Sequence, residues 1–126
     1  MRVAGFGFRG GAALASLQDA LQRALALAGD DPLEALVTES AKSRAPVFRE
    51  LAQVMALPGL GIQLEDLQQL ITPTQSRQVL DRFGTGSLCE AAALAAAGPG
   101  ATLVAVRVVS GDGMATAAIA DLKGTT

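Results

Sequence analysis

Apolar positions at the start of the chain change their spacing near residue 12. Val3–Phe6 is a short apolar run that leads into the glycine-rich segment 7–11. Beyond it, apolar residues recur at intervals of three and four, namely Leu14, Leu17, Leu21, Leu25 and Ala28. A short run bounded by loop residues is typical of a buried strand, whereas the longer interval forms one face of a helix. We therefore expect a strand over 3–6 and then a helix that begins at residue 12 and ends at Gly29.

The same alternation of short apolar runs and helical spacing continues to residue 70. Residues 35–37 and 60–64 are further strand candidates. Between them, Pro46 suits the first turn of a helix. The apolar face of that helix consists of Phe48, Leu51, Ala52 and Met55. Residues 65–70 are expected to form a short helix.

Two more helix starts are indicated by capping patterns. Thr72-Pro73-Thr74-Gln75 combines a capping hydroxyl, a proline at the first helical position and a glutamine three residues after the cap. The helix that follows is expected to end near Phe83-Gly84. Ser87 and Glu90 repeat the pattern at the start of an alanine-rich helix, which Gly98 ends.

The strongest strand pattern is Thr102–Val109, where six of the eight residues are Leu, Val or Ala. Because both alternating faces are apolar, we expect a central strand that is covered on both sides. Residues 110–113 read as a hairpin turn, and Met114–Ala120 as the antiparallel partner. This order predicts one α/β domain over 1–126, a three-layer α/β/α sandwich with a mixed sheet of about five strands and a closing β-hairpin.

Composition narrows the functional classes. The net charge is −2 and the chain has no Trp or Tyr, which argues against a nucleic-acid partner. It has no His and a single cysteine, Cys89, so neither a metal site nor a Ser–His–Asp arrangement is expected. No apolar stretch reaches the length of a membrane span and no signal peptide is visible, so we expect a cytoplasmic protein that does not associate with membranes.

The first candidate ligand site is the segment that joins the first strand to the first helix. Glycines allow a close backbone approach, the helix start attracts anions, and arginine grips carboxylates or phosphates. The candidate residues here are Gly7, Arg9, Gly10 and Gly11. The segment also fits G-x-G-x-x-G, but no acidic residue closes the second strand, and no Gly-Lys-Ser/Thr follows. The alternative is a tight turn with an exposed arginine.

Two later loops are candidates for the same site, because ligands gather beyond the carboxyl ends of strands in open α/β sheets. The loop after the second strand supplies Thr38, Lys42 and Arg44, and the loop before the alanine-rich helix supplies Gly84, Thr85, Gly86 and Ser87. Each has a simpler explanation, as an ordinary solvated loop and as a capped helix start. Cys89 lacks an activating histidine, so we interpret it as structural.

Four segments together resemble the family formed by CobE and the C-terminal domain of CbiG, proteins of cobalamin biosynthesis. Gly5-Phe6-Gly7-Phe8-Arg9-Gly10 resembles its opening G-[IV]-G-C-R-[RK]-G, and 38–46 with Lys42 resembles T-x-x-x-K-x-x-E-P. Residues 84–93 are similar to G-V-G-S-V-x-E-A-A-A, and 107–120 to a strand, a glycine turn and a T-V-A-I-A strand. The segments occur in the family's order and span nearly the whole chain.

The resemblance implies a mixed-sheet α/β/α domain that binds or carries an anionic corrin-ring intermediate, a tetrapyrrole. Longer members of the family open a lactone ring on a cobalt-corrin precursor and release acetaldehyde. This chain matches their C-terminal part and begins at its own Met1, so we expect the short, stand-alone type of the oxygen-dependent route. Arg9, Lys42, Arg44 and the glycine-rich helix starts are then expected to hold carboxylates, while small apolar residues accept the ring.

Two alternatives remain open at this point. The first is an enzyme of the same pathway, a hydrolase or rearranging enzyme related to cobalt-precorrin-5A hydrolase, with Lys42 and Glu90 as its candidate catalytic residues. The second is a phosphate- or nucleotide-binding module at residues 7–11. No cofactor is expected, and the expected partners are the corrinoid intermediate and other enzymes of the cobalamin pathway.

Overall fold

The computed structural model describes residues 1–77, 79–80 and 86–122, and within them five strands form one mixed sheet. The strands are β1 (Arg2–Phe8), β2 (Ala35–Glu39), β3 (Gly59–Ile62), β4 (Thr102–Val109) and β5 (Ala115–Asp121). Their order is β3-β2-β1-β5-β4. The first three run parallel, whereas β5 is antiparallel to both β1 and β4. The expected mixed sheet with a closing hairpin is confirmed.

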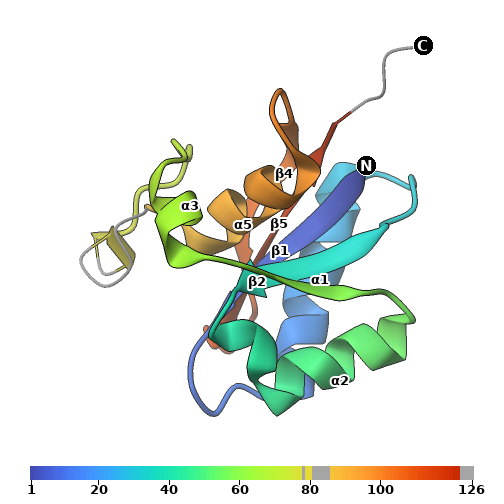
Figure 1. The fold of residues 1–126 in the computed structure, drawn as a ribbon. Coiled ribbons are helices and arrows are strands. Elements are labelled where there is room, and N and C mark those ends of the chain that lie inside the picture. The colour runs from blue at the N-terminus through green and yellow to red at the C-terminus, as the bar shows by residue number, and fades with distance from the viewer. Residues whose placement is uncertain (78, 81–85, 123–126) are drawn as a thin grey trace.

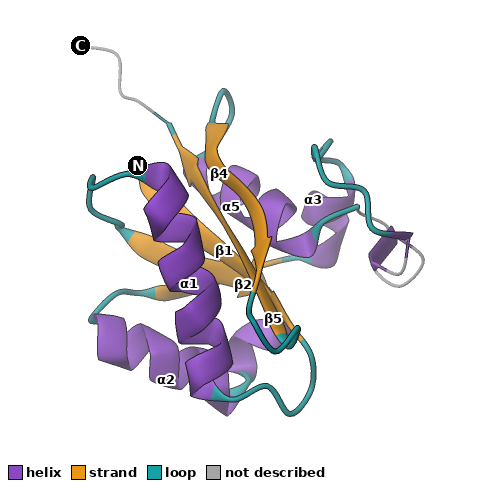
Figure 2. Ribbon diagram, turned by 180° about the vertical axis from the view of Figure 1, so that it is seen from behind, coloured by secondary structure: helices purple, strands orange, loops and turns teal. Residues whose placement is uncertain are grey.

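Helices cover both faces of this sheet (Figures 1 and 2). On one face lie α1 (Leu14–Ala28) and α2 (Pro46–Met55), and on the other lie α3 (Leu64–Gln68) and α5 (Leu88–Ala97). A short 3-10 turn, η1 (Lys42–Arg44), precedes α2. Each face has its own apolar core, which we call the α1-side core and the α5-side core. The three-layer α/β/α arrangement is therefore confirmed.

Glycine at position 5 allows α5 to pack unusually close to β1. A Cβ atom placed on Gly5 would lie 2.1 Å from the carbonyl oxygen of Cys89 and 2.7 Å from the backbone nitrogen of Ala93. No side chain fits in that space. The first glycine of the G-x-G-x-x-G pattern thus lies inside a strand and serves helix–sheet packing, whereas the turn itself uses Gly11, at φ +84°.

The expectation that β4 is a central strand is wrong, because β4 forms one edge of the sheet. Val106 and Val109 are 47% and 40% exposed, whereas β1 and β5 are buried along most of their length. The hairpin folds β5 between β4 and β1, so the later of the two strands takes the interior place. An apolar composition on both faces does not distinguish these positions.

Both predicted capping boxes are also wrong in detail. Residues 73–76 are not helical, and Ser76 takes the capping role, since its hydroxyl accepts from the backbone N–H of Val79 at 3.4 Å. The expected end near Phe83-Gly84 lies outside the described residues. Ser87 does precede α5, but its side chain makes no capping hydrogen bond, and the Glu90 carboxylate points elsewhere. Tertiary partners have displaced the local pair at Glu90, whereas Thr72 and Gln75 stay bonded to each other outside a helix.

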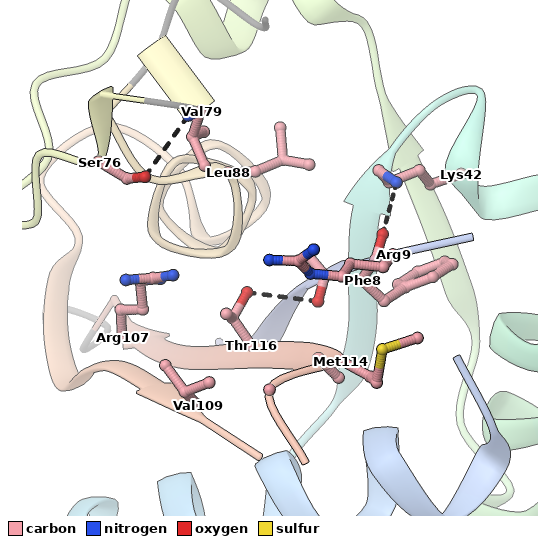
Figure 3. A pocket seen from close by; sticks show the side chains of 13 residues that line it. Phe8, Arg9, Lys42, Ser76, Val79, Leu88, Arg107, Val109, Met114 and Thr116 are labelled. Carbon is pink, nitrogen blue, oxygen red and sulfur yellow. Dashed lines mark hydrogen bonds between the residues drawn. The ribbon is translucent and has the colours of Figure 1, made fainter. Parts of the chain in front are cut away.

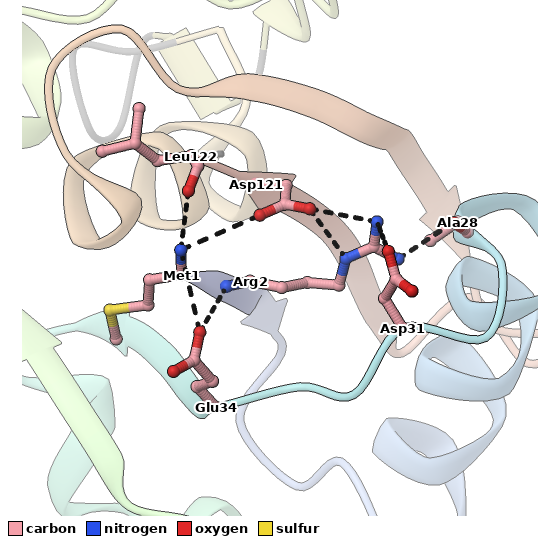
Figure 4. A network of polar contacts seen from close by, with 7 residues as sticks. All are labelled: Met1, Arg2, Ala28, Asp31, Glu34, Asp121 and Leu122. Atoms are coloured by element: carbon pink, nitrogen blue, oxygen red, sulfur yellow. Dashed lines mark hydrogen bonds and ion pairs between the residues drawn. The ribbon is translucent and has the colours of Figure 1, made fainter. Parts of the chain in front are cut away.

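At the amino-terminal end of β1, a polar network ties the start of the chain to the end of β5 (Figure 4). The guanidinium of Arg2, only 7% exposed, pairs with Asp121 at 3.1 Å and donates to the carbonyl oxygen of Ala28 at 3.0 Å. The terminal ammonium of Met1 donates to the carbonyl oxygen of Leu122 at 2.7 Å. Because these groups are mutually bonded, we assign this end of the sheet a structural role.

None of the helices in the described part of the chain has the length and apolar character that crossing a bilayer requires.

Candidate functional site

A cleft of about 230 Å³ opens at the carboxyl end of β1, where β5 begins and β4 ends (Figure 3). It is formed by four parts of the chain: the end of β1, the loop after β2, the segment that leads into α5, and the β4–β5 hairpin. The lining residues are Gly7, Phe8, Arg9, Lys42, Ser76, Val79, Leu88, Arg107, Val109, Gly113, Met114, Ala115 and Thr116. The cleft therefore lies at the edge of the sheet where open α/β proteins gather ligands.

Lys42 joins the loop after β2 to the end of β1. Its ammonium donates a hydrogen bond to the carbonyl oxygen of Phe8 at 2.6 Å. The same nitrogen lies 4.9 Å from the centroid of the Phe8 ring, within the range of a cation–π contact. Lys42 is thus held at the rim of the cleft, where it places a positive charge beside an aromatic surface.

Two arginines bring further positive charge to the cleft from different strands. Arg9 follows β1 directly and is exposed, and its backbone N–H donates to the carbonyl oxygen of Met114 at 2.9 Å. Arg107 comes from β4, and both guanidinium groups point into the cleft in Figure 3. Among the residues that the structure describes, neither guanidinium is paired with a carboxylate. Within the described part of the chain, both guanidinium groups therefore face the cleft without a carboxylate partner.

β4 contains two register shifts, or bulges, relative to β5, one between Leu103 and Ala105 and one between Ala105 and Val108, and Arg107 lies in the second. Between Ala105 and Val108 this strand advances three residues while β5 advances only two, from Ile119 to Ala117. One extra residue reverses the alternation of side chains beyond it. Leu103 packs in the α5-side core, whereas Ala105 packs in the α1-side core, so the first shift exchanges the two faces and the second exchanges them back. Arg107 therefore lies on the face that α5 covers, the same face as Leu103.

Apolar side chains and one hydroxyl complete the cleft. The apolar residues come from β1, β4, the β4–β5 hairpin, the start of α5 and the segment before it, namely Phe8, Val109, Met114, Leu88 and Val79. The hydroxyl of Thr116 donates to the carbonyl oxygen of Gly7 at 3.3 Å. A Cβ on Gly7 would approach that hydroxyl to 2.8 Å, so glycine keeps this part of the cleft open.

The structure brings three of the proposed ligand residues into the cleft lining and places the others beside or beneath it. Gly7, Arg9 and Lys42 line the cleft, whereas Gly10 and Gly11 are exposed in the loop next to Arg9. Thr38 is fully buried, and its hydroxyl donates to the carbonyl oxygen of Phe6 at 2.9 Å, which links β2 to β1.

The remaining proposed residues fall elsewhere. Arg44 lines a separate groove beside α2, together with Phe48 and Arg49. Gly86 and Ser87 are buried and do not line the cleft, although Leu88, the next residue, does. Gly84 and Thr85 lie outside the described residues.

Of the two candidate catalytic residues, only Lys42 lines the cleft. The carboxylate of Glu90 is fully buried behind the lining, where backbone and hydroxyl donors surround it. Cys89 is fully buried as well, and burial raises the pKa of its thiol, which agrees with a structural cysteine.

Sequence reasoning missed the cleft residues that β4, the hairpin and the segment before α5 supply, above all Arg107 and Thr116. One signal was present: Arg107 is the only charged residue in the apolar strand Thr102–Val109. An isolated charge in such a strand needs either solvent or a partner. Arg107 occupies the same face as Leu103, four residues earlier, but the spacing does not show that this face borders a cleft.

The chemistry of the cleft is that of an anion site with an apolar side. Arg9 and Arg107 offer planar, forked donors that suit carboxylates or phosphates, and Lys42 adds a point charge. Within the described ranges, no cluster of three or more His, Cys, Asp or Glu residues is arranged to hold a metal ion. The lining therefore favours a ligand that combines negative groups with an apolar surface.

Fold and cleft together define an α/β/α protein with a cationic ligand cleft at the carboxyl edge of its sheet. Residues 2–120 match the model of the family described as cobalamin synthesis G C-terminus, and the chain belongs to this family. It is thus a cobalamin biosynthesis protein of the CobE and CbiG type.

Solved structures agree with this assignment. CobE, a protein from the cobalamin (vitamin B12) biosynthetic pathway, superposes with a TM-score of 0.88 at 29% identity, over 100% of this chain and 93% of CobE. The cobalamin biosynthesis protein chiG from Agrobacterium tumefaciens is 36% identical with a TM-score of 0.75, over 98% of this chain and all of its own.

A more distant structure shares the fold alone. A putative cobalamin biosynthesis protein G homolog from Sulfolobus solfataricus is 16% identical with a TM-score of 0.70, and 98% of this chain covers 37% of that protein. No functionally curated protein matches the sequence.

Proposed function

We propose that the protein binds an anionic corrin-ring intermediate of cobalamin biosynthesis in the cleft between β1, β4 and the start of α5. The observation that carries the proposal is the arrangement of Arg9, Lys42 and Arg107 around an apolar lining. Precursors of the corrin ring are broad apolar macrocycles with carboxylates on their periphery. The lining offers a partner for each of these features.

The volume of the cleft indicates how such a ligand would be held. At about 230 Å³ the cleft is smaller than the roughly 300–1,000 Å³ typical of enclosed small-molecule pockets. A tetrapyrrole would therefore insert one edge, with its carboxylates toward the arginines, and leave the rest of the ring outside. Partial enclosure suits a protein that receives and passes on an intermediate.

The groups that line the cleft support binding more than acid–base catalysis. The described lining contains no carboxylate, imidazole or thiol, and the Lys42 ammonium is held by the carbonyl oxygen of Phe8. Proton transfer needs a positioned acid or base of suitable pKa. An enzymatic role in the same pathway therefore has less support from the residues of this site.

The direct test is a titration of purified protein with carboxylate-bearing corrin intermediates, followed by visible absorption. We expect a spectral shift that saturates at micromolar concentrations in the wild type. Charge-assisted hydrogen bonds contribute about 1.5–3 kcal/mol, so Arg9→Ala and Arg107→Ala should each weaken binding by about tenfold or more. Affinity should also fall as salt is raised.

Arg44→Ala is the matched control, because Arg44 is a nearby arginine that lines a different groove. Its affinity should equal that of the wild type. The proposal is refuted if no intermediate shifts the spectrum, or if Arg44→Ala weakens binding as much as Arg107→Ala does. Conversion of the added intermediate into a new chromophore would instead favour the enzymatic alternative.

A further inference from the structure

Glu90 is a fully buried carboxylate to which three hydrogen-bond donors converge. One oxygen accepts from the backbone N–H of Thr74 at 2.9 Å. The other accepts from the Thr74 hydroxyl at 3.0 Å and from the backbone N–H of Arg107 at 2.9 Å. Because Glu90 lies in the first turn of α5, the helix dipole also favours its negative charge.

The donors belong to two separate walls of the cleft. One wall is strand β4, and the other is the segment that leads into α5. Arg107 lies in the second bulge of β4, where its N–H has left the ladder with β5. Thr74 lies two residues before Ser76, whose hydroxyl caps the turn that carries Val79. Through one side chain, α5 thus holds both the strand that presents the Arg107 guanidinium and the segment that presents Ser76 and Val79.

A carboxylate is the side chain that this junction needs. It presents two oxygens that only accept, and each of the three groups around it donates. In Glu90→Gln one of the oxygens becomes an amide nitrogen that donates, and it would face another donor. The side chain would keep its size, but at least one wall would lose its anchor.

We propose that Glu90 is a positioning residue of the cleft, which stabilises the second bulge and so directs the Arg107 guanidinium toward the ligand. This inference rests on the proposed function. It differs from the expectation that Glu90 is catalytic, because the carboxylate reaches the ligand only through Arg107 and the segment at Thr74.

A double-mutant cycle on binding tests it, with uroporphyrin, a tetrapyrrole with free peripheral carboxylates, as the probe. We expect Glu90→Gln to weaken binding by about tenfold in the wild-type background and by less than about twofold in the Arg107→Ala background, since residues that act as a unit are not additive. Equal losses in both backgrounds, or unchanged affinity of Glu90→Gln, would overturn the proposal.

Asp121→Asn is the control for a general loss of stability, because Asp121 is a largely buried carboxylate at the opposite end of the sheet. It should lower the melting temperature without changing the affinity. If it weakens binding as much as Glu90→Gln, the effect of Glu90 is one of stability alone and the proposal fails.

Amide hydrogen exchange separates this inference from the proposed function. The amides of Thr74 and Arg107 should be protected in the wild type and should lose protection in Glu90→Gln, whether or not uroporphyrin binds. If uroporphyrin does not bind but the two amides show this pattern of protection, the proposed ligand is refuted. Glu90 is then still the group that holds the two walls. Rapid exchange of both amides in the wild type would refute the anchor, and that measurement does not require the variant to fold.

Discussion

Replacement of Gly5 by alanine tests the close contact between α5 and β1 on which the geometry of the cleft depends. The added Cβ would lie 2.1 Å from the carbonyl oxygen of Cys89, and Cβ contacts under 3.0 Å are essentially never seen. The helix backbone must therefore retreat by about 1 Å at this point. It cannot yield by rotation of a side chain, because the atoms in the way belong to the backbones of Cys89 and Ala93.

The cost follows from how tightly this region is packed. Insertion of a methyl group into a well-packed core destabilises by about 1–3 kcal/mol, and we expect the upper end because a whole helix must shift. For a domain of this size about 3 kcal/mol corresponds to a fall in melting temperature of about 10 °C. A typical domain has a stability of about 5–15 kcal/mol, so the variant should still fold.

Thermal and urea unfolding, followed by circular dichroism, measure this effect. Gly10→Ala is the matched control from the same glycine-rich segment, because a Cβ on Gly10 meets nothing within 4 Å. It should unfold within about 2 °C of the wild type, as surface substitutions usually do. If Gly5→Ala also unfolds within this range, the helix is not in close contact with the strand and our reasoning about Gly5 is wrong.

Three further predictions concern groups that do not line the cleft. Asp121→Asn weakens the buried contacts of Arg2 and should lower the unfolding free energy by about 1–2 kcal/mol in urea titrations, and no change would contradict the network of Figure 4. The Ser110 hydroxyl is the main group that lowers the pKa of Asp112, from 3.8 to about 2. The stability that this carboxylate contributes is therefore present above pH 3.8 and is lost as the pH falls toward 2. The melting temperature of the wild type should accordingly fall more between those pH values than that of Asp112→Asn, and parallel curves would refute the assignment. Burial raises the pKa of the Cys89 thiol, so a thiol reagent at about pH 8 should label the protein only in denaturant, and rapid labelling of the native state would show that the thiol is accessible.

Local signals in the sequence were sufficient to place most elements. The spacing of the leucines in 14–25 predicted α1, and Gly29 ends it at φ +91° as expected. Pro46 starts α2, and residues 110–113 turn the hairpin. These features depend on neighbouring residues and on backbone dihedral preferences, so they can be read without tertiary information.

The candidate site was predictable only in part, for the same reason. Arg9 and Lys42 follow the carboxyl ends of parallel strands, and the general rule for such sheets brought them to one edge. Arg107 needed more information, because its strand lies at the far edge of the sheet and its backbone N–H is bonded to Glu90, seventeen residues earlier in the chain. No periodicity in Thr102–Val109 marks the two register shifts between Leu103 and Val108.

By itself, the sequence determined the order of strands and helices along the chain and the presence of both parallel and antiparallel strands in the sheet. It also determined the membership of a family of cobalamin biosynthesis proteins. The tertiary structure alone decided that β5 is an interior strand and β4 an edge strand, that Gly5 serves helix packing, and that Glu90 bonds to Thr74 and Arg107 instead of capping its own helix. The physical reason is that a buried donor, acceptor or close contact takes the best partner available in space. Capping spacings and apolar patterns describe only the partners nearby in the chain.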